Sequence, residues 1–103
     1  MYKYVLRNSL YLDDELQDYF NEMSKKGWRL DFVSYYYRFV KDEHVYKYQI
    51  DYTPISSEYQ DILKEMGYHE VRNSFDDFRV LENENVDAPD LNTEFVFDKN
   101  NKM

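Results

Sequence analysis

Five polar residues form the strongest candidate for a site in this sequence. They lie in two similar stretches, MYKYVLR at residues 1–7 and YKYQIDY at residues 46–52, which alternate large and polar side chains. Because successive side chains of a β-strand point to opposite faces, the alternation places these polar residues on one face of a sheet. The face then carries cations, an amide and a carboxylate. The five residues are Lys3, Arg7, Lys47, Gln49 and Asp51.

Two uses of this polar surface are open. It can recognise a small acidic ligand, or it can meet a second copy of the chain in a sheet-to-sheet homodimer. The alternative is an ordinary solvated surface, because exposed cross-strand ion pairs contribute only about 0.2–1 kcal/mol each.

The other residues capable of chemistry predict no metal centre, no cofactor and no catalytic residue. The chain has no cysteine, and neither His44 nor His69 has a third ligand at a spacing typical of metal sites. Its two glycines are too few to build a glycine-rich phosphate loop. We therefore predict that the protein is not an enzyme. A cofactor-independent enzyme of the dimeric α+β barrel kind, with its pocket between open sheet faces, is the alternative.

A tyrosine-rich run from residue 28 to residue 52 is the centre of the predicted fold. Its aromatic and β-branched residues favour two strands, 28–40 and 45–52, joined by the polar turn KDEH at 41–44. Apolar residues at helical spacing predict one helix before Gly27 and another before Gly67, since glycine is the usual residue just past a helix end.

An internal repeat relates the two parts of the chain. YKYVLR at residue 2 resembles YKYQID at residue 46, and each stretch precedes a helix, a glycine and an aromatic residue that opens a strand. Ser34-Tyr35 and Ser74-Phe75 follow their glycines at equal distances. Two successive β-α-β halves predict a ferredoxin-like βαββαβ fold, in which a four-stranded antiparallel sheet carries two helices on one face.

In that topology the first and third strands are central. We expect Tyr4, Leu6, Tyr48 and Ile50 to face the helices and the polar set to face outward. The length of 103 residues fits one domain, which we assign to residues 1–82. Residues 83–103 are predicted to be an acidic tail.

One apolar segment interrupts this tail. Phe95, Val96 and Phe97 form the centre of a short strand at 93–98, which can dock as an edge strand on its own chain or on a partner chain.

The net charge of −8 argues against a nucleic acid or an anionic membrane as the main partner, because binding phosphates requires lysine and arginine. The residues after Met1 predict no secretory leader, and no apolar run approaches the ~20 residues that span a membrane. We therefore expect a cytoplasmic protein without membrane insertion, whose partner is a second copy or another protein.

The strings NEMSKKGWRL, YYYRF, YKYQIDY and EYQDILKEMGYHEV resemble the bacterial family of the domain of unknown function 2812. The resemblance covers about residues 2–81. The last strand departs from it, because DDFRVL replaces the aromatic-rich pattern of the family and keeps only Phe78 and Arg79. Many members continue into transmembrane helices, and we expect none within this sequence. The resemblance implies no activity, substrate or catalytic residue, so the predicted function is a non-enzymatic interaction or sensing module that self-associates.

Overall fold

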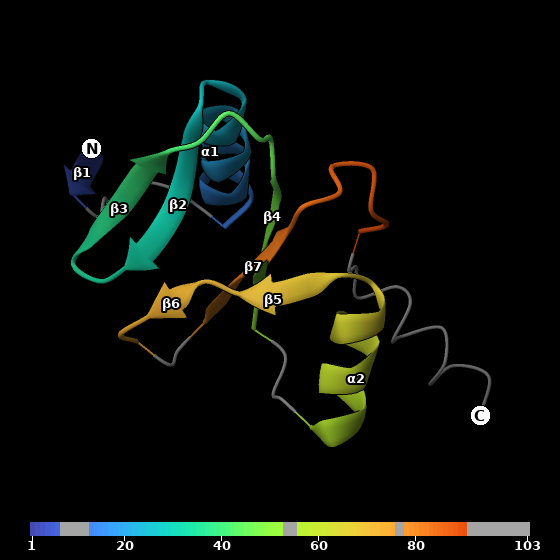
Figure 1. Ribbon diagram of the computed structural model, residues 1–103. Coiled ribbons are helices and arrows are strands. Elements are labelled where there is room, and N and C mark those ends of the chain that lie inside the picture. Colours follow the sequence, from blue (N-terminus) through green and yellow to red (C-terminus); the bar gives the residue numbers. More distant parts are fainter. Residues whose placement is uncertain (7–12, 53–55, 76–77, 91–103) are drawn as a thin grey trace.

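The computed structural model describes residues 1–6, 13–52, 56–75 and 78–90, which form an α+β fold (Figure 1). The two helices and seven strands of this part of the chain follow one another along the sequence without a long insertion. They are β1 (Tyr2–Leu6), α1 (Asp13–Lys25), β2 (Trp28–Val33), β3 (Tyr36–Lys41), β4 (Lys47–Asp51), α2 (Ser57–Glu65), β5 (Tyr68–Glu70), β6 (Arg72–Asn73) and β7 (Arg79–Asn83).

The tyrosine-rich run folds differently from the prediction. The hairpin turn lies at Ser34 and Tyr35, between β2 and β3, and not at residues 41–44. A register shift between Leu30 and Phe32 exchanges the inward and outward positions of β2. The shift lets Leu30 and Val33 both face the core, which simple alternation does not allow. Residues 42–46 instead cross to a second sheet.

Two sheets replace the single antiparallel sheet of the ferredoxin-like prediction. The first has the strand order β1-β3-β2-β6, and its β2–β6 pair is parallel. The second has the order β4-β7-β5 and is antiparallel. β1 is therefore an edge strand, and β4 belongs to the other sheet. The predicted domain boundary after Glu82 falls inside β7, and residues 84–90 follow it as a described loop.

The predicted internal repeat is present in a longer form, as two βαββ halves. The order β1-β3-β2 in the first half corresponds to β4-β7-β5 in the second. The registers correspond as well: Tyr4 pairs with Arg38, and the repeat-related Tyr48 pairs with Glu82. Each helix is followed, two residues after its last residue, by a glycine with positive φ, +93° at Gly27 and +87° at Gly67.

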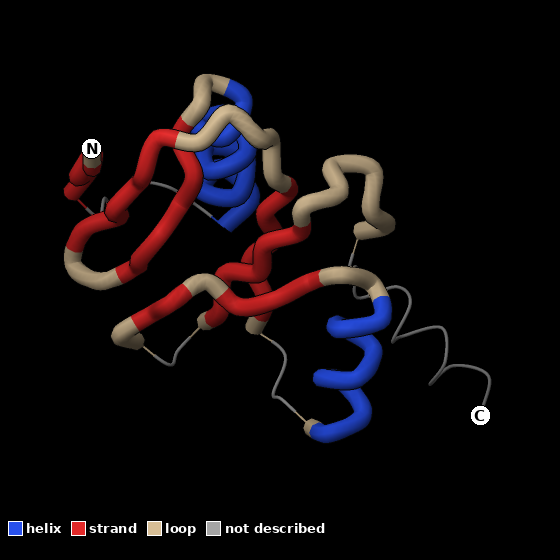
Figure 2. The backbone as a smooth tube through the Cα atoms, in the orientation of Figure 1, coloured by secondary structure: helices blue, strands red, loops and turns tan. Residues whose placement is uncertain are grey.

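The halves meet where equivalent segments of the repeat pair in parallel. Strands β2 and β6 pair Phe32 with Arg72 and Val33 with Asn73, which are equivalent positions of the repeat. The hydroxyls of Ser34 and Ser74 lie 3.0 Å apart. At the same turns the rings of Tyr35 and Phe75 meet edge to face, 5.4 Å apart. The tube in Figure 2 shows β5 and β6 as one continuous path that reaches from the second sheet to the first.

The main core is shared by the two halves. Phe20 of α1 contacts Tyr37 of β3 and Tyr48 of β4, with ring centroids 5.1 and 6.2 Å apart. A smaller core under α2 contains Leu63, Tyr68, Leu81 and Ala88. Helix α1 therefore packs against both sheets, whereas α2 packs on β5.

The predicted orientation of β1 is wrong. Tyr2, Tyr4 and Leu6 are 52, 58 and 81% exposed, and Val5 is the residue of β1 that packs against the core. Tyr2, Tyr4 and Leu6 alternate with Lys3 and Val5 along the strand, so they lie on the opposite, solvent side of the sheet. On β4, Tyr48 faces the core as predicted.

Candidate interaction surface

The described members of the five-residue polar set proposed from sequence lie on two different sheets. Lys3 lies on β1, where its ammonium is 5.5 Å from the centre of the Trp28 ring. Arg7 and residues 95–97 lie outside the described residues. The other three residues of the set lie on β4, in the second sheet.

The three β4 residues are held by internal contacts. Lys47 donates to the carbonyl of Ala88 at 2.6 Å and forms an ion pair with Asp90. Asp51 is 9% exposed and accepts from the hydroxyl of Tyr59 at 2.8 Å and from Arg79 at 3.0 Å. Gln49 is buried as well. The polar residues of β4 therefore do not form an open face.

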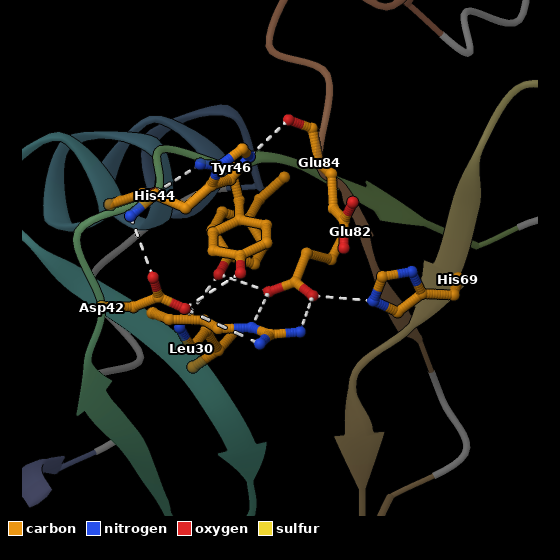
Figure 3. A network of polar contacts seen from close by, with 10 residues as sticks. Leu30, Asp42, His44, Tyr46, His69, Glu82 and Glu84 are labelled. Carbon is orange, nitrogen blue, oxygen red and sulfur yellow. Dashed lines mark hydrogen bonds and ion pairs between the residues drawn. The ribbon is translucent and has the colours of Figure 1, made fainter.

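Sequence reasoning missed the buried polar network that joins the halves (Figure 3). At its centre is Glu82 of β7, whose side chain is 2% exposed. Its two oxygens accept from Arg29 Nη2 and Nε at 2.8 and 3.0 Å, and from the Tyr48 hydroxyl at 2.7 Å. The His69 ring nitrogen Nε2 lies 2.7 Å from the same carboxylate. The carboxylate is thus fully partnered.

Electrostatics in this network favour a structural role. Burial, and then the negative charge of Glu82, raise the pKa of Tyr48 well above its usual value. The hydrogen bond from Arg29 to Glu82 likewise raises the pKa of the guanidinium. A tyrosine kept protonated and an arginine kept charged do not donate protons to a substrate near neutral pH. We assign the network a structural role, because the contacts of Glu82 join β7 to β2, β4 and β5.

Asp42 extends the network to the loop between β3 and β4. Its carboxylate accepts from the backbone amide of His44 and the hydroxyl of Tyr46, both at 2.9 Å, and these bonds lower its pKa. His44 Nε2 lies 2.7 Å from the carbonyl oxygen of Glu84. Both histidines are thus bound to protein groups. Among the residues with described positions, no group of three or more histidine and acidic side chains is arranged to hold a metal ion.

Helix α1 covers the outer edge of β4 with side chains that bond to its backbone. Asn21 accepts from the amide of Tyr48 at 2.7 Å and donates to its carbonyl at 3.3 Å. Gln17 accepts from the amide of Ile50 at 2.9 Å, and Ser24 from the amide of Tyr46 at 2.7 Å. Residues four and three positions apart lie on one helix face, so a single face of α1 serves as the next strand. The edge of β4 is therefore closed.

The equivalent edge of β1 is open within the described part of the chain. β1 pairs with β3 and ends the first sheet, and α2 packs elsewhere, on β5. An edge strand presents a row of backbone donors and acceptors to which another strand can pair. Of the two equivalent strand edges in the described part of the repeat, that of β4 is covered by α1 and that of β1 is open to pairing with another strand.

Aromatic and arginine side chains cover the solvent side of the first sheet beside this edge. The Tyr4 ring meets Tyr36 edge to face, with centroids 5.3 Å apart. The Arg38 guanidinium lies 4.7 Å from the centre of the Tyr2 ring, and Arg72 lies 5.4 Å from that of Phe32. We call this surface the aromatic–arginine face; it consists of Tyr2, Tyr4, Phe32, Tyr36, Arg38 and Arg72.

Part of this surface could have been found from sequence. Tyr2, Tyr4 and Tyr36 are conspicuous as tyrosines on predicted strands, but the sequence does not say which face is outward. Arg38 and Glu82 occupy equivalent positions of the repeat and are the only charged residues opposite a tyrosine of β1 or β4 in the two ladders. The sequence signal for a difference between the two halves was therefore the positive charge of Arg38 at the position where the second half has the negative charge of Glu82.

Comparison with known families gives a match over most of the chain. A family model described as "Protein of unknown function (DUF2812)" matches residues 13–102, from the start of α1 onward. No curated protein matches the chain. No solved structure matches it either. In the described ranges, neither helix has the length and apolar character needed to cross a membrane.

Proposed function

The chain belongs to the DUF2812 family, whose function is unknown, and we propose that it is a non-enzymatic interaction module that self-associates through β1 and the aromatic–arginine face. The open edge of β1 is the observation that carries the proposal, because the repeat-related edge of β4 is closed by α1. Strand addition at a sheet edge supplies main-chain hydrogen bonds, and neighbouring side chains supply specificity.

The chemistry of the neighbouring face suits a protein partner. Tyrosine and arginine are enriched at the centres of protein interfaces, and tyrosine gives a large contact area at the cost of fixing only two side-chain torsions. Here Tyr2 and Tyr4 lie more than half exposed at the edge itself. Among the described residues of the predicted polar set, Lys3 belongs to the proposed site, on the other side of β1.

An enzyme or a small-ligand site between open sheet faces has less support. The polar residues that such a site would use on β4 are bound to Ala88, Asp90, Tyr59 and Arg79. The buried Glu82 carboxylate is likewise fully engaged.

Sedimentation equilibrium of the full chain tests the proposal. Tyr4→Lys places a charge at the edge and should weaken self-association at least about tenfold. Tyr52→Lys is the matched control, because Tyr52 is 54% exposed and Tyr4 58%, and it should leave association within about twofold. A wild-type chain that remains monomeric at millimolar concentration contradicts the proposal, as does equal weakening by both variants.

A further inference from the structure

We infer that residues 94–98 of a second copy of this chain form the strand that pairs with β1. The inference rests on the proposed function, and it names the partner segment. It follows from the side-chain order of the segment, from the local charge around β1 and from the place where the described chain ends.

The segment EFVFD has the side-chain order that β1 requires in a partner strand. When Val96 is opposite Val5 in an antiparallel ladder, Phe97 is opposite Tyr4 and Asp98 is opposite Lys3. The carboxylate then meets an ammonium on the helix side, and the two aromatic residues pack on the solvent side. Both are favourable cross-strand pairs.

Reversing the segment preserves this match. In a parallel ladder with Val96 opposite Val5, Phe95 lies opposite Tyr4 and Glu94 opposite Lys3. The match survives because the segment reads acid, phenylalanine, valine, phenylalanine, acid. The match therefore follows from this symmetric order of side chains and does not depend on strand direction.

Local charge explains how two acidic chains can approach each other. The whole chain carries −8, but β1 and β3 contain no acidic residue and hold Lys3, Lys41 and Arg38, the last of which is paired with Asp31 of β2. Arg72 adds a further cation to the aromatic–arginine face. The basic surface and the acidic segment are thus complementary, and such complementarity accelerates and orients association.

The end of the described chain favours a second copy over the chain's own segment. Asp90 is bound by Lys47 at the start of β4, in the second sheet. The four residue steps from Asp90 to Glu94 span at most about 14 Å. In Figure 1, β3, β2 and β4 lie between β1 and the end of the described loop after β7. A second copy has no such restriction, and two copies that exchange segments form a closed two-fold dimer.

A mixing experiment with two full-length variants tests the inference. Tyr4→Lys damages the β1 edge, and Val96→Asp places a charge in the apolar centre of the segment. Each variant alone loses both exchanged contacts and should associate at least about tenfold more weakly than wild type. An equimolar mixture retains one intact contact, the segment of the first variant on β1 of the second. Native mass spectrometry should therefore show the heterodimer above either homodimer.

Val86→Asp is the matched control for the segment variant, because Val86 is an exposed valine outside the segment. It should leave the dimer unchanged. The inference is overturned, with the proposed function intact, if Tyr4→Lys dissociates the dimer and Val96→Asp does not. It is also overturned if the mixture shows no excess heterodimer. If neither variant alters association, both the inference and the proposed function fail.

A segment that docks on its own chain gives a different result. The wild type is then monomeric, and Val96→Asp increases hydrogen exchange of the β1 amides at every protein concentration. That result overturns the second copy as the source of the strand and also removes the proposed self-association.

Discussion

At the level of single residues, Glu82 has the most demanding environment in the described chain. Its carboxylate is buried between the two halves and is compensated by Arg29, Tyr48 and His69. A buried charge is tolerated when every partner is present and is costly when one is lost. Stability should therefore depend strongly on the charge of Glu82, although its surroundings do not suggest catalysis.

Glu82→Gln tests this dependence. The amide removes the bidentate counter-charge of Arg29, which keeps Asp42 at 3.8 Å from Nη1, and it introduces hydrogen-bond donors that face other donors. The unfolding free energy should therefore fall by about 3–5 kcal/mol. Urea denaturation measures the change. Glu84→Gln is the control and should stay within about 0.5 kcal/mol, because the side chain of Glu84 is exposed and only its carbonyl is used. Equal losses contradict the role assigned to Glu82.

The ionisation of Tyr68 should make the stability of the fold depend on pH in the alkaline range. Burial, and then the charge of Asp90, raise the pKa of its phenol to about 12, and its hydroxyl donates to the carbonyl of Pro89 at 3.0 Å. A folded-state pKa above the unfolded value of about 10 means that its contribution to stability is complete below pH 10. The contribution is lost as pH rises from 10 toward 12.

Urea midpoints measured from pH 8 upward follow this loss. Tyr68→Phe should be somewhat less stable at pH 8 because it lacks the hydrogen bond. Above pH 10 its decline should be shallower than that of the wild type, since the phenylalanine does not ionise. Parallel curves over the whole range would show that Tyr68 ionises as it does in the unfolded chain.

At the level of elements, helix α1 serves as the neighbouring strand of β4. Asn21→Ala should cost about 1–3 kcal/mol, because it leaves a backbone amide of β4 without its partner. Hydrogen exchange should show faster exchange at Tyr48. Glu22→Ala is the control, because this exposed neighbour forms only a surface ion pair with Lys25. Unchanged exchange at Tyr48 would contradict the role of Asn21.

The success of the sequence predictions differed between elements. Both helices were predicted correctly, since their apolar spacing and the glycines after them are local signals. The hairpin was placed wrongly because residues 28–41 are rich in strand-forming side chains throughout. The true turn at Ser34 and Tyr35 depends on contacts with the repeat-related turn, 40 residues away in the chain for Ser34 and Ser74.

The candidate site was harder to predict for a related reason. Whether Tyr4 faces inward depends on where α1 lies, and α1 packs over β2 and β4. The Glu82 network joins residues up to 53 positions apart, so no short motif marks it. The repeat was detectable because finding it requires only a comparison of two segments of the sequence, without knowledge of which segments are in contact.

At the level of the whole molecule, the shared core predicts one cooperative unfolding transition. Leu16 and Phe20 of the first half belong to the same cluster as Tyr46, Tyr48 and Val80 of the second. Neither half can bury these side chains alone, so the halves should unfold together. Scanning calorimetry should give a calorimetric enthalpy equal to the van't Hoff enthalpy. Two separated transitions would contradict a shared core.

The repeat also has a consequence for the history of the chain. Equivalent tyrosines have diverged in environment without changing in type: Tyr4 is largely exposed, and Tyr48 is buried. In a symmetric dimer of two half-length chains, the equivalent tyrosines of both copies would have the same environment. One could be buried and the other exposed only if the dimer were asymmetric. Fusion of two gene copies removes that restriction, because each copy then mutates separately. A duplication followed by separate change of the two copies would account for a buried tyrosine at the closed edge of β4 and an exposed one at the edge strand β1.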